Sequence, residues 1–212
     1  MASYAPEFLS LALIHFLAVV APGPDFAITI SQSVRHGRRA GIYTALGIGA
    51  GISVHVIYTI LGIGALMHAS TVLMNAARII GALYICYLAV NLLRAQPAVA
   101  GDPSDIQGKA ENQTNGQSFS IGFFTNATNP KATLFFLAVF TTMVSATTPL
   151  SIQAGYGVWM CAVNASWFVI VALFFSNPKV RQSFLKTGYW FERCMGGLLL
   201  AFAMKLLWGM TS

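Results

Sequence analysis

The stretch that decides the fold is residues 8–33, FLSLALIHFLAVVAPGPDFAITISQS. It is predominantly apolar, but Pro22 and Pro24 flank a glycine near its centre, and Asp25 follows them. About 20 apolar residues in a helix cross the hydrocarbon core of a bilayer. Proline lacks an N–H group and breaks a helix interior. We therefore expect a membrane-spanning helix that is interrupted near mid-depth, beside an acidic side chain.

Further apolar runs of similar length follow the first one. They cover residues 40–67, 71–93, 119–144, 149–175 and 189–210. Strands of an outer-membrane barrel would alternate polar and apolar residues, and these runs do not, so helices are the expected spanning element. The sequence thus predicts an all-α integral membrane protein with six transmembrane helices.

The composition is that of a membrane protein. Hydrophobic residues make up 56% of the 212-residue chain and charged residues 8%, whereas soluble domains carry about 25% charged residues. So few charged side chains could not cover the surface of a water-soluble globule. This excludes an ordinary soluble enzyme, a nucleic-acid-binding domain and a disordered protein.

The basic residues predict how the chain is oriented in the bilayer. The loops after the first, third and fifth runs carry Arg35, Arg38, Arg39, Arg94, Lys109, Lys179, Arg181 and Lys186. The other loops and the amino-terminal segment carry no Lys or Arg. Cytoplasmic loops have an excess of these residues, so we expect the three basic loops in the cytoplasm and both termini on the outer side.

The chain is predicted to consist of two related halves. Residues 95–118 are rich in Pro, Gly, Ser, Asn and Gln and cannot form a core of their own. We interpret them as a cytoplasmic linker between three-helix repeats at residues 1–94 and 119–212. Pro22 and Pro130 have the same sequence separation as Gly47 and Gly155. An odd number of spans in each half makes the repeat an inverted one, with helices 1 and 4 broken at the prolines.

Opposite charges lie at the two breaks. An ionisable residue inside a membrane helix costs about 2.5–3.5 kcal/mol on insertion scales and usually has a function. Asp25 could bind the ammonium group of a zwitterionic amino acid, and Lys131 its carboxylate. A plain Asp25–Lys131 ion pair that joins the halves without a ligand remains the alternative. The predicted substrate site comprises Pro22, Gly23, Pro24, Asp25, Asn126, Asn129, Pro130 and Lys131, with hydroxyl groups of Thr125 and Thr128 beside it.

Other polar and small residues have less specific interpretations. Arg78 and Arg193 either snorkel to the interface or gate the two faces, with Glu192 as a partner. His55 either packs among helices or lines the cavity. Gly47, Gly49 and Gly51 are expected to form one closely packed helix face, within the bundle or at a dimer seam. The histidines and the isolated cysteines lack metal-ligand spacing, so we expect no metal and no cofactor.

Two motifs resemble those of a known family. APGPDFAITISQSVRHGRRAGIYTALGIGAG at residues 21–51 and GFFTNATNPKATLFF at residues 122–136 are similar to the LysE/RhtB amino-acid exporters, and within them to the threonine and homoserine exporters. The resemblance covers almost the whole chain, except residues 95–118 and the carboxyl-terminal end. It implies a homodimeric carrier in a bacterial inner membrane that exports amino acids by proton antiport. Small neutral substrates such as threonine and homoserine are favoured, and serine, leucine and cationic amino acids stay open. It also places the substrate pathway at the PGPD and NPK motifs.

Two other classes of protein stay open. A cation or metal-ion carrier or channel could share this architecture, but it has no use for a paired cation and anion. A membrane enzyme or assembly scaffold would need a nucleophile and base or larger outer loops, and neither is visible. We therefore expect a secondary transporter, not an enzyme, that alternates access around Asp25 and Lys131.

Overall fold

The computed structural model describes residues 4–69, 71–96, 113–145 and 147–211, and all regular structure in these ranges is helical. The predicted all-α class is confirmed. The helices are α1 (Ala5–Val20), α2 (Pro24–Arg35), α3 (Arg38–Ala69), α4 (Thr71–Leu93), α5 (Asn115–Ala127), α6 (Pro130–Met143), α7 (Leu150–Phe175) and α8 (Pro178–Thr211). Most of the predicted linker, including Lys109, lies outside the described residues.

Both predicted helix breaks are present. α1 ends at Val20 and α2 begins at Pro24, with a bend of 51° between them. α5 ends at Ala127, and α6 begins at Pro130. A proline at the first helical position loses nothing, because the N–H it lacks would be unpaired there. In both halves of the chain a proline therefore starts the helix that follows the break.

The structure supports fewer spans than the sequence predicts. Arg38–Gly62, Asn75–Leu93 and Leu150–Phe175 are each long and apolar enough to cross a membrane, and the bent α1–α2 pair could form one more span. In the described residues the fourth predicted run is divided between α5 and the short apolar helix α6, and the sixth is part of the longer α8. Six spans are therefore not confirmed.

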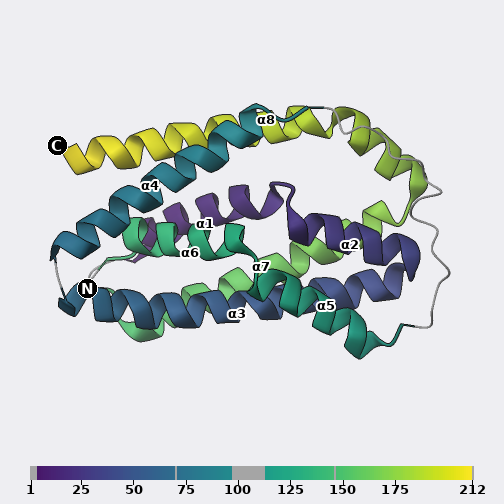
Figure 1. The fold of residues 1–212 in the computed structure, drawn as a ribbon, viewed down its shortest axis with the longest axis horizontal. Coiled ribbons are helices and arrows are strands. Elements are labelled where there is room, and N and C mark those ends of the chain that lie inside the picture. Colours follow the sequence, from purple (N-terminus) through teal and green to yellow (C-terminus); the bar gives the residue numbers. More distant parts are fainter. Residues whose placement is uncertain (1–3, 70, 97–112, 146, 212) are drawn as a thin grey trace.

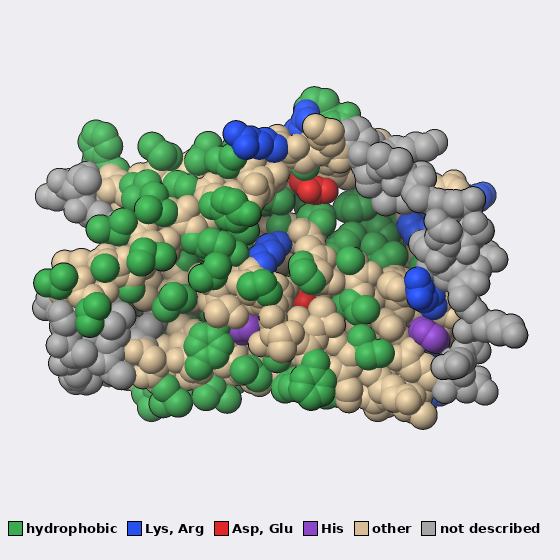
Figure 2. Space-filling model, viewed as in Figure 1, with side chains coloured by type: hydrophobic (Ala, Val, Ile, Leu, Met, Phe, Trp, Pro, Cys, Tyr) green, Lys and Arg blue, Asp and Glu red, His purple; other side chains and the backbone are tan. Residues whose placement is uncertain are grey.

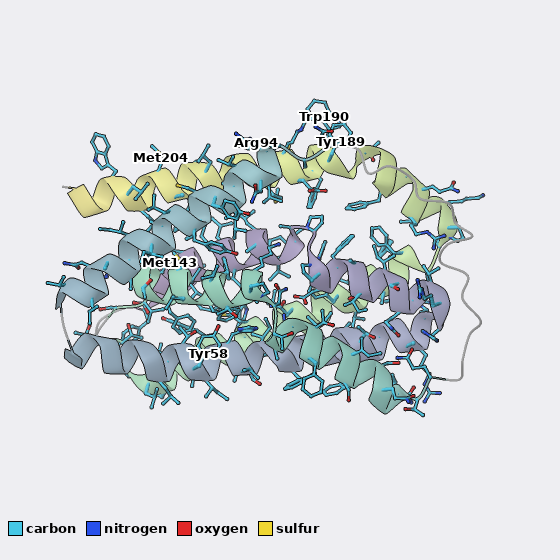
Figure 3. The ribbon with its side chains drawn as sticks, in the orientation of Figure 1. Tyr58, Arg94, Met143, Tyr189, Trp190 and Met204 are labelled. Atoms are coloured by element: carbon cyan, nitrogen blue, oxygen red, sulfur yellow. The ribbon has the colours of Figure 1, made fainter. Side chains whose placement is uncertain are left out.

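The helices run roughly along one long axis (Figure 1). Both chain ends lie at one end of this axis, together with the α3–α4 and α6–α7 connections. The α2–α3 and α7–α8 connections lie at the opposite end. The basic residues of two predicted cytoplasmic loops flank these connections in the helix ends, namely Arg35, Arg38 and Arg39 beside the first and Lys179 and Arg181 beside the second. α4 stops well short of that end, and Arg94 lies about midway along the axis (Figure 3).

Helices from both halves of the chain build one interior. α3 packs against α5 and α7, and α4 packs against α6 and α8. The main buried cluster combines Leu11 of α1, Ile85 of α4, Phe136 of α6, Met160 of α7 and Leu199 of α8. Between membrane helices the hydrophobic effect adds little, so close contact of the backbones has to hold them together.

Glycines let α3 approach two helices at once. A Cβ atom added at Gly47 would overlap the backbone of Phe119 in α5, whereas one added at Gly49 would lie 2.6 Å from the Cβ of Ala165 in α7. Gly51 faces α5 again, at Asn126. The prediction of a single glycine face is wrong, because residues two apart in a helix point to different sides.

We predict that Gly47→Ala destabilises the protein, since the added methyl group has no room against the α5 backbone. Overpacking of this kind costs about 1–3 kcal/mol, so thermal unfolding of the detergent-purified protein should occur several degrees lower. Gly62→Ala is the matched control on the same helix, because nothing lies within 4 Å of its added Cβ. Equal melting temperatures for both variants would contradict this account of α3 packing.

Candidate functional site

A cavity lies where the two helix breaks meet. Its volume of about 50 Å³ is room for a few water molecules. Its polar lining consists of His15, Asp25, Asn126, Asn129, Lys131 and Asn164, and Gly23 lies among them. Five of the predicted site residues (Gly23, Asp25, Asn126, Asn129 and Lys131) are therefore brought together around one space.

The Asp25 carboxylate sits at the beginning of α2. The Nδ2 group of Asn126 donates a hydrogen bond of 2.8 Å to its Oδ2 atom. The other oxygen, Oδ1, is buried and has no hydrogen-bond partner in the described part of the chain. The positive end of the α2 dipole adds a favourable field. One oxygen is thus fixed by the other half of the chain, and one is left without a donor.

The Lys131 ammonium group is held by the broken end of α1. Its Nζ atom donates to the carbonyl oxygens of Ala21 at 3.1 Å and Pro22 at 3.4 Å. These carbonyls follow the last turn of α1, where the break removes the N–H partners that a continuous helix would supply. Gly23 keeps space beside the ammonium group, because a Cβ there would lie 3.3 Å from Nζ.

Asp25 and Lys131 share the cavity but do not form an ion pair. Among the described residues no Lys nitrogen approaches Asp25 within the 4.0 Å of a salt bridge. Instead, Asn126 of the second half holds the Asp25 carboxylate, and backbone carbonyls of the first half hold Lys131. The plain ion pair is therefore absent from this structure, and the side-chain hydrogen bonds of each charged group go to neutral groups of the opposite half.

Asn129 and the prolines shape the breaks themselves. The Asn129 side chain accepts a hydrogen bond of 3.0 Å from the Lys131 N–H and so caps α6. Pro22 and Pro130 line a second cavity of about 410 Å³ on the other side of Lys131, whose wall includes Tyr84 of α4. Pro24 begins α2 and lines neither cavity.

The surface near this second cavity is hollowed. Figure 2 shows a face covered largely by apolar side chains, with a depression between α8 and the α1–α2 break where acidic and basic side chains are visible. Thr125 and Thr128, expected beside the site, instead line a shallow surface depression on the outside of α5.

His55 packs behind the cavity instead of lining it. Its Nε2 atom lies 2.8 Å from the carbonyl oxygen of Asn126, and its Nδ1 atom lies 2.8 Å from the hydroxyl of Tyr58. A carbonyl can only accept, so Nε2 carries the hydrogen, and in the neutral ring Nδ1 accepts from Tyr58. The ring is fully buried and stacks on Phe136. His55 therefore positions Asn126, which in turn holds Asp25.

Two polar residues of the cavity, His15 and Asn164, were not among the predicted site residues. The Nδ2 group of Asn164 lies 2.9 Å from His15 Nε2, and both side chains are buried. Each is an isolated polar residue inside an apolar run, as Asp25 and Lys131 are. That shared pattern was the available signal, but which face of its helix each residue occupies is not visible in the sequence.

The two arginines considered as gates lie away from the cavity. Arg78 of α4 donates through Nε to the carbonyl of Thr141 at 3.1 Å, in the last turn of α6. Arg193 of α8 donates to the carbonyl of Ala95 at 3.0 Å and lies 5.1 and 5.4 Å from the rings of Tyr189 and Trp190 (Figure 3). Both hold the ends of neighbouring helices together, and a gating role stays a prediction.

A charged cavity between two broken helices is an arrangement that membrane transporters use for their substrate sites. The chain belongs to the family described as LysE type translocator, whose model matches residues 16–209. The resemblance seen in the PGPD and NPK motifs is thereby confirmed.

Several curated relatives carry names that state an activity. Threonine efflux proteins of Salmonella typhi and Escherichia coli strain K12 are each 28% identical, over 204 and 203 residues, which is 94% of this chain and 97% of theirs. A homoserine/homoserine lactone efflux protein of Salmonella typhimurium is 29% identical over 124 residues, 58% of either chain. No solved structure matches.

We predict that Asn126→Asp destabilises the protein, because it replaces the donor to Asp25 with a second carboxylate. Loss of this buried hydrogen bond should cost about 1–3 kcal/mol. Adding Asp25→Asn to the same chain restores one donor and one acceptor with exchanged roles and should recover the melting temperature. If the double variant melts as low as Asn126→Asp alone, the Asn126–Asp25 contact does not stabilise the site.

Proposed function

We propose that this chain exports small neutral amino acids across a bacterial inner membrane, with the cavity at the helix breaks as its substrate site. The observation that carries the proposal is the separation of charge in this cavity. Asp25 and Lys131 face one space without touching each other, and the hydrogen bonds of each charged side chain go to neutral groups. A zwitterion is the ligand class that uses both charges at once.

The unpartnered atoms match the two ends of an amino acid. Asp25 Oδ1 and Asn126 Oδ1 are buried acceptors without partners in the described chain, which suits the three N–H donors of a substrate ammonium group. Lys131 also has three donors, and its bonds to Ala21 and Pro22 are the long ones of the site. A substrate carboxylate could take their place. Gly23, Pro22, Pro24, Asn129 and Pro130 would shape the pathway around these groups.

The names of the relatives support a threonine-like substrate. Threonine efflux proteins match along nearly their whole length, and a homoserine/homoserine lactone efflux protein matches over about half. The small cavity favours a small substrate as well. It must still widen before a whole amino acid fits.

We infer that transport alternates between two conformations of an inverted repeat, residues 1–94 against 119–212 joined by the linker 95–118. The order of helices supports this, since each half has a helix, a proline break, a short helix and two long helices. The basic connections would face the cytoplasm and both termini the outside. The bonds between Asp25 and Asn126 and between Lys131 and Ala21 cross the two halves, so they would break and form as access alternates. The hydrogen bonds of Arg78 to Thr141 and of Arg193 to Ala95, at the ends of α6 and α4, would loosen in the same transition.

Proton antiport and a homodimer complete the proposal. Asp25 is the acidic group of the cavity and could exchange a proton for the substrate ammonium group.

For a dimer, Gly155 and Gly197 leave open space on apolar helices, as a seam of small residues between two copies requires. The remaining apolar surface of the protein would contact the lipid bilayer.

The first test is export from cells. Bacteria expressing the chain would be loaded with dipeptides, and amino acids in the medium quantified by mass spectrometry. We expect threonine, homoserine or a close analogue to leave at least several-fold faster than from control cells. Asp25→Asn and Lys131→Gln should each abolish the gain. Normal export by Asp25→Asn, or no export by a correctly inserted wild type, would reject the proposal and direct attention to a cation carrier, tested by conductance.

A second test addresses the coupling ion. A protonophore that collapses the pH gradient should reduce threonine export to the level of cells without the protein, because outward movement of substrate would no longer be driven by inward movement of protons. Collapse of the sodium gradient serves as the control and should leave export unchanged. Undiminished export after the pH gradient is lost would exclude proton antiport.

A further inference from the structure

His15 is a polar residue of the cavity that has no role in the proposed contacts of Asp25 and Lys131 with the substrate. It lies on α1 with 1% of its surface exposed. Its ring is surrounded by aromatic rings, with centroid distances of 5.6 Å to Trp159, 6.1 Å to Phe136 and 6.2 Å to Phe135. An imidazole in such apolar surroundings needs partners for both ring nitrogens.

The contact with Asn164 fixes the tautomer of this ring. The Asn164 Nδ2 group also donates to the carbonyl oxygen of Met160 at 3.1 Å, which establishes that the NH₂ side of the amide faces both neighbours. His15 Nε2 must therefore accept, and the hydrogen sits on Nδ1. The ring is held neutral, because a hydrogen on Nε2 would face another donor.

The Nδ1–H group is left without an acceptor. No described residue accepts a hydrogen bond from it, although the atom is buried. His15 lines the cavity that contains Asp25 and Lys131, so widening of this cavity around a ligand would let a ligand oxygen supply the missing acceptor. A buried donor without a partner destabilises the empty site, and a ligand oxygen would remove that penalty.

We propose that His15, oriented by Asn164, forms a subsite for the side chain of the substrate and binds a hydroxyl oxygen there. This rests on the proposed amino-acid transport. Asp25 and Asn126 offer acceptors for the ammonium group, and Lys131 offers a donor for the carboxylate. Asn129 caps α6 and Asn164 orients His15, and His15 itself offers one neutral, unpaired donor in an aromatic wall. That chemistry fits a short side chain with a hydroxyl group better than an apolar, acidic or basic one.

The test compares threonine with valine, which have the same shape apart from a hydroxyl in place of a methyl group. Purified protein in proteoliposomes would be assayed by counterflow with each labelled amino acid. We expect wild type to prefer threonine by about tenfold, the effect of one buried donor left unpaired by valine. His15→Leu removes the donor at similar size, so the ratio should fall toward one through loss of threonine transport. Leu13→Phe, on the exposed side of α1, should keep the wild-type ratio.

Several results would overturn the subsite. An unchanged ratio of threonine to valine transport in His15→Leu would show that His15 does not contribute to recognition of the substrate side chain. Equal losses of threonine and valine transport would indicate that the Nδ1–H group donates to the carboxylate common to all amino acids. If His15→Leu does not fold, competition in wild type decides, and serine must compete about tenfold better than alanine; equal competition refutes the inference. Counterflow of no amino acid at all would instead reject the proposed function.

Discussion

Two proline breaks leave backbone groups unpaired inside the bundle, and the arrangement of the site follows from how these groups are satisfied. A helix that stops at Val20 exposes the carbonyls of its last turn, and a helix that starts at Pro24 exposes N–H groups. In lipid such groups cannot turn to water. The Lys131 ammonium group takes the carbonyls of Ala21 and Pro22, and the Asp25 carboxylate lies at the beginning of α2. The unpaired backbone groups at the breaks thus supply polar surroundings in which these two charged side chains can be buried.

This compensation requires the two halves of the chain to be in close contact. Asn126 of α5 donates to Asp25 of α2, and α5 itself lies directly against α3, where glycines at 47, 51 and 122 remove the side chains that would separate these two helices. His55 reaches the Asn126 carbonyl across the same contact. The close helix packing therefore serves the site as well as stability, since any separation of α3 from α5 would move the group that fixes the Asp25 carboxylate.

The sequence predicts the parts of this site whose signal is local. Pro22, Pro24 and Pro130 end helices by their own covalent structure, and Asp25 and Lys131 stand out as charges in apolar runs. What the sequence does not predict depends on helix rotation and register. These are the absence of an Asp25–Lys131 ion pair, the place of His55 behind Asn126, the helices that the α3 glycines face, and the pairing of His15 with Asn164. The hydrophobic pattern gives no rotation for helices that are apolar on all sides.

The way the charges are held also bears on how such a site could work. A direct ion pair between Asp25 and Lys131 would be a deep minimum in low dielectric, and a ligand would have to break it before binding. Neutral partners hold each charge less tightly. A zwitterion can then replace the Ala21 and Pro22 carbonyls at Lys131 and fill the vacant side of Asp25, so the new bonds offset those it breaks. Because the displaced contacts join opposite halves of the chain, binding would weaken the link between the halves at the moment the substrate is held. That coupling between occupancy and contact is what a carrier needs in order to move only when loaded.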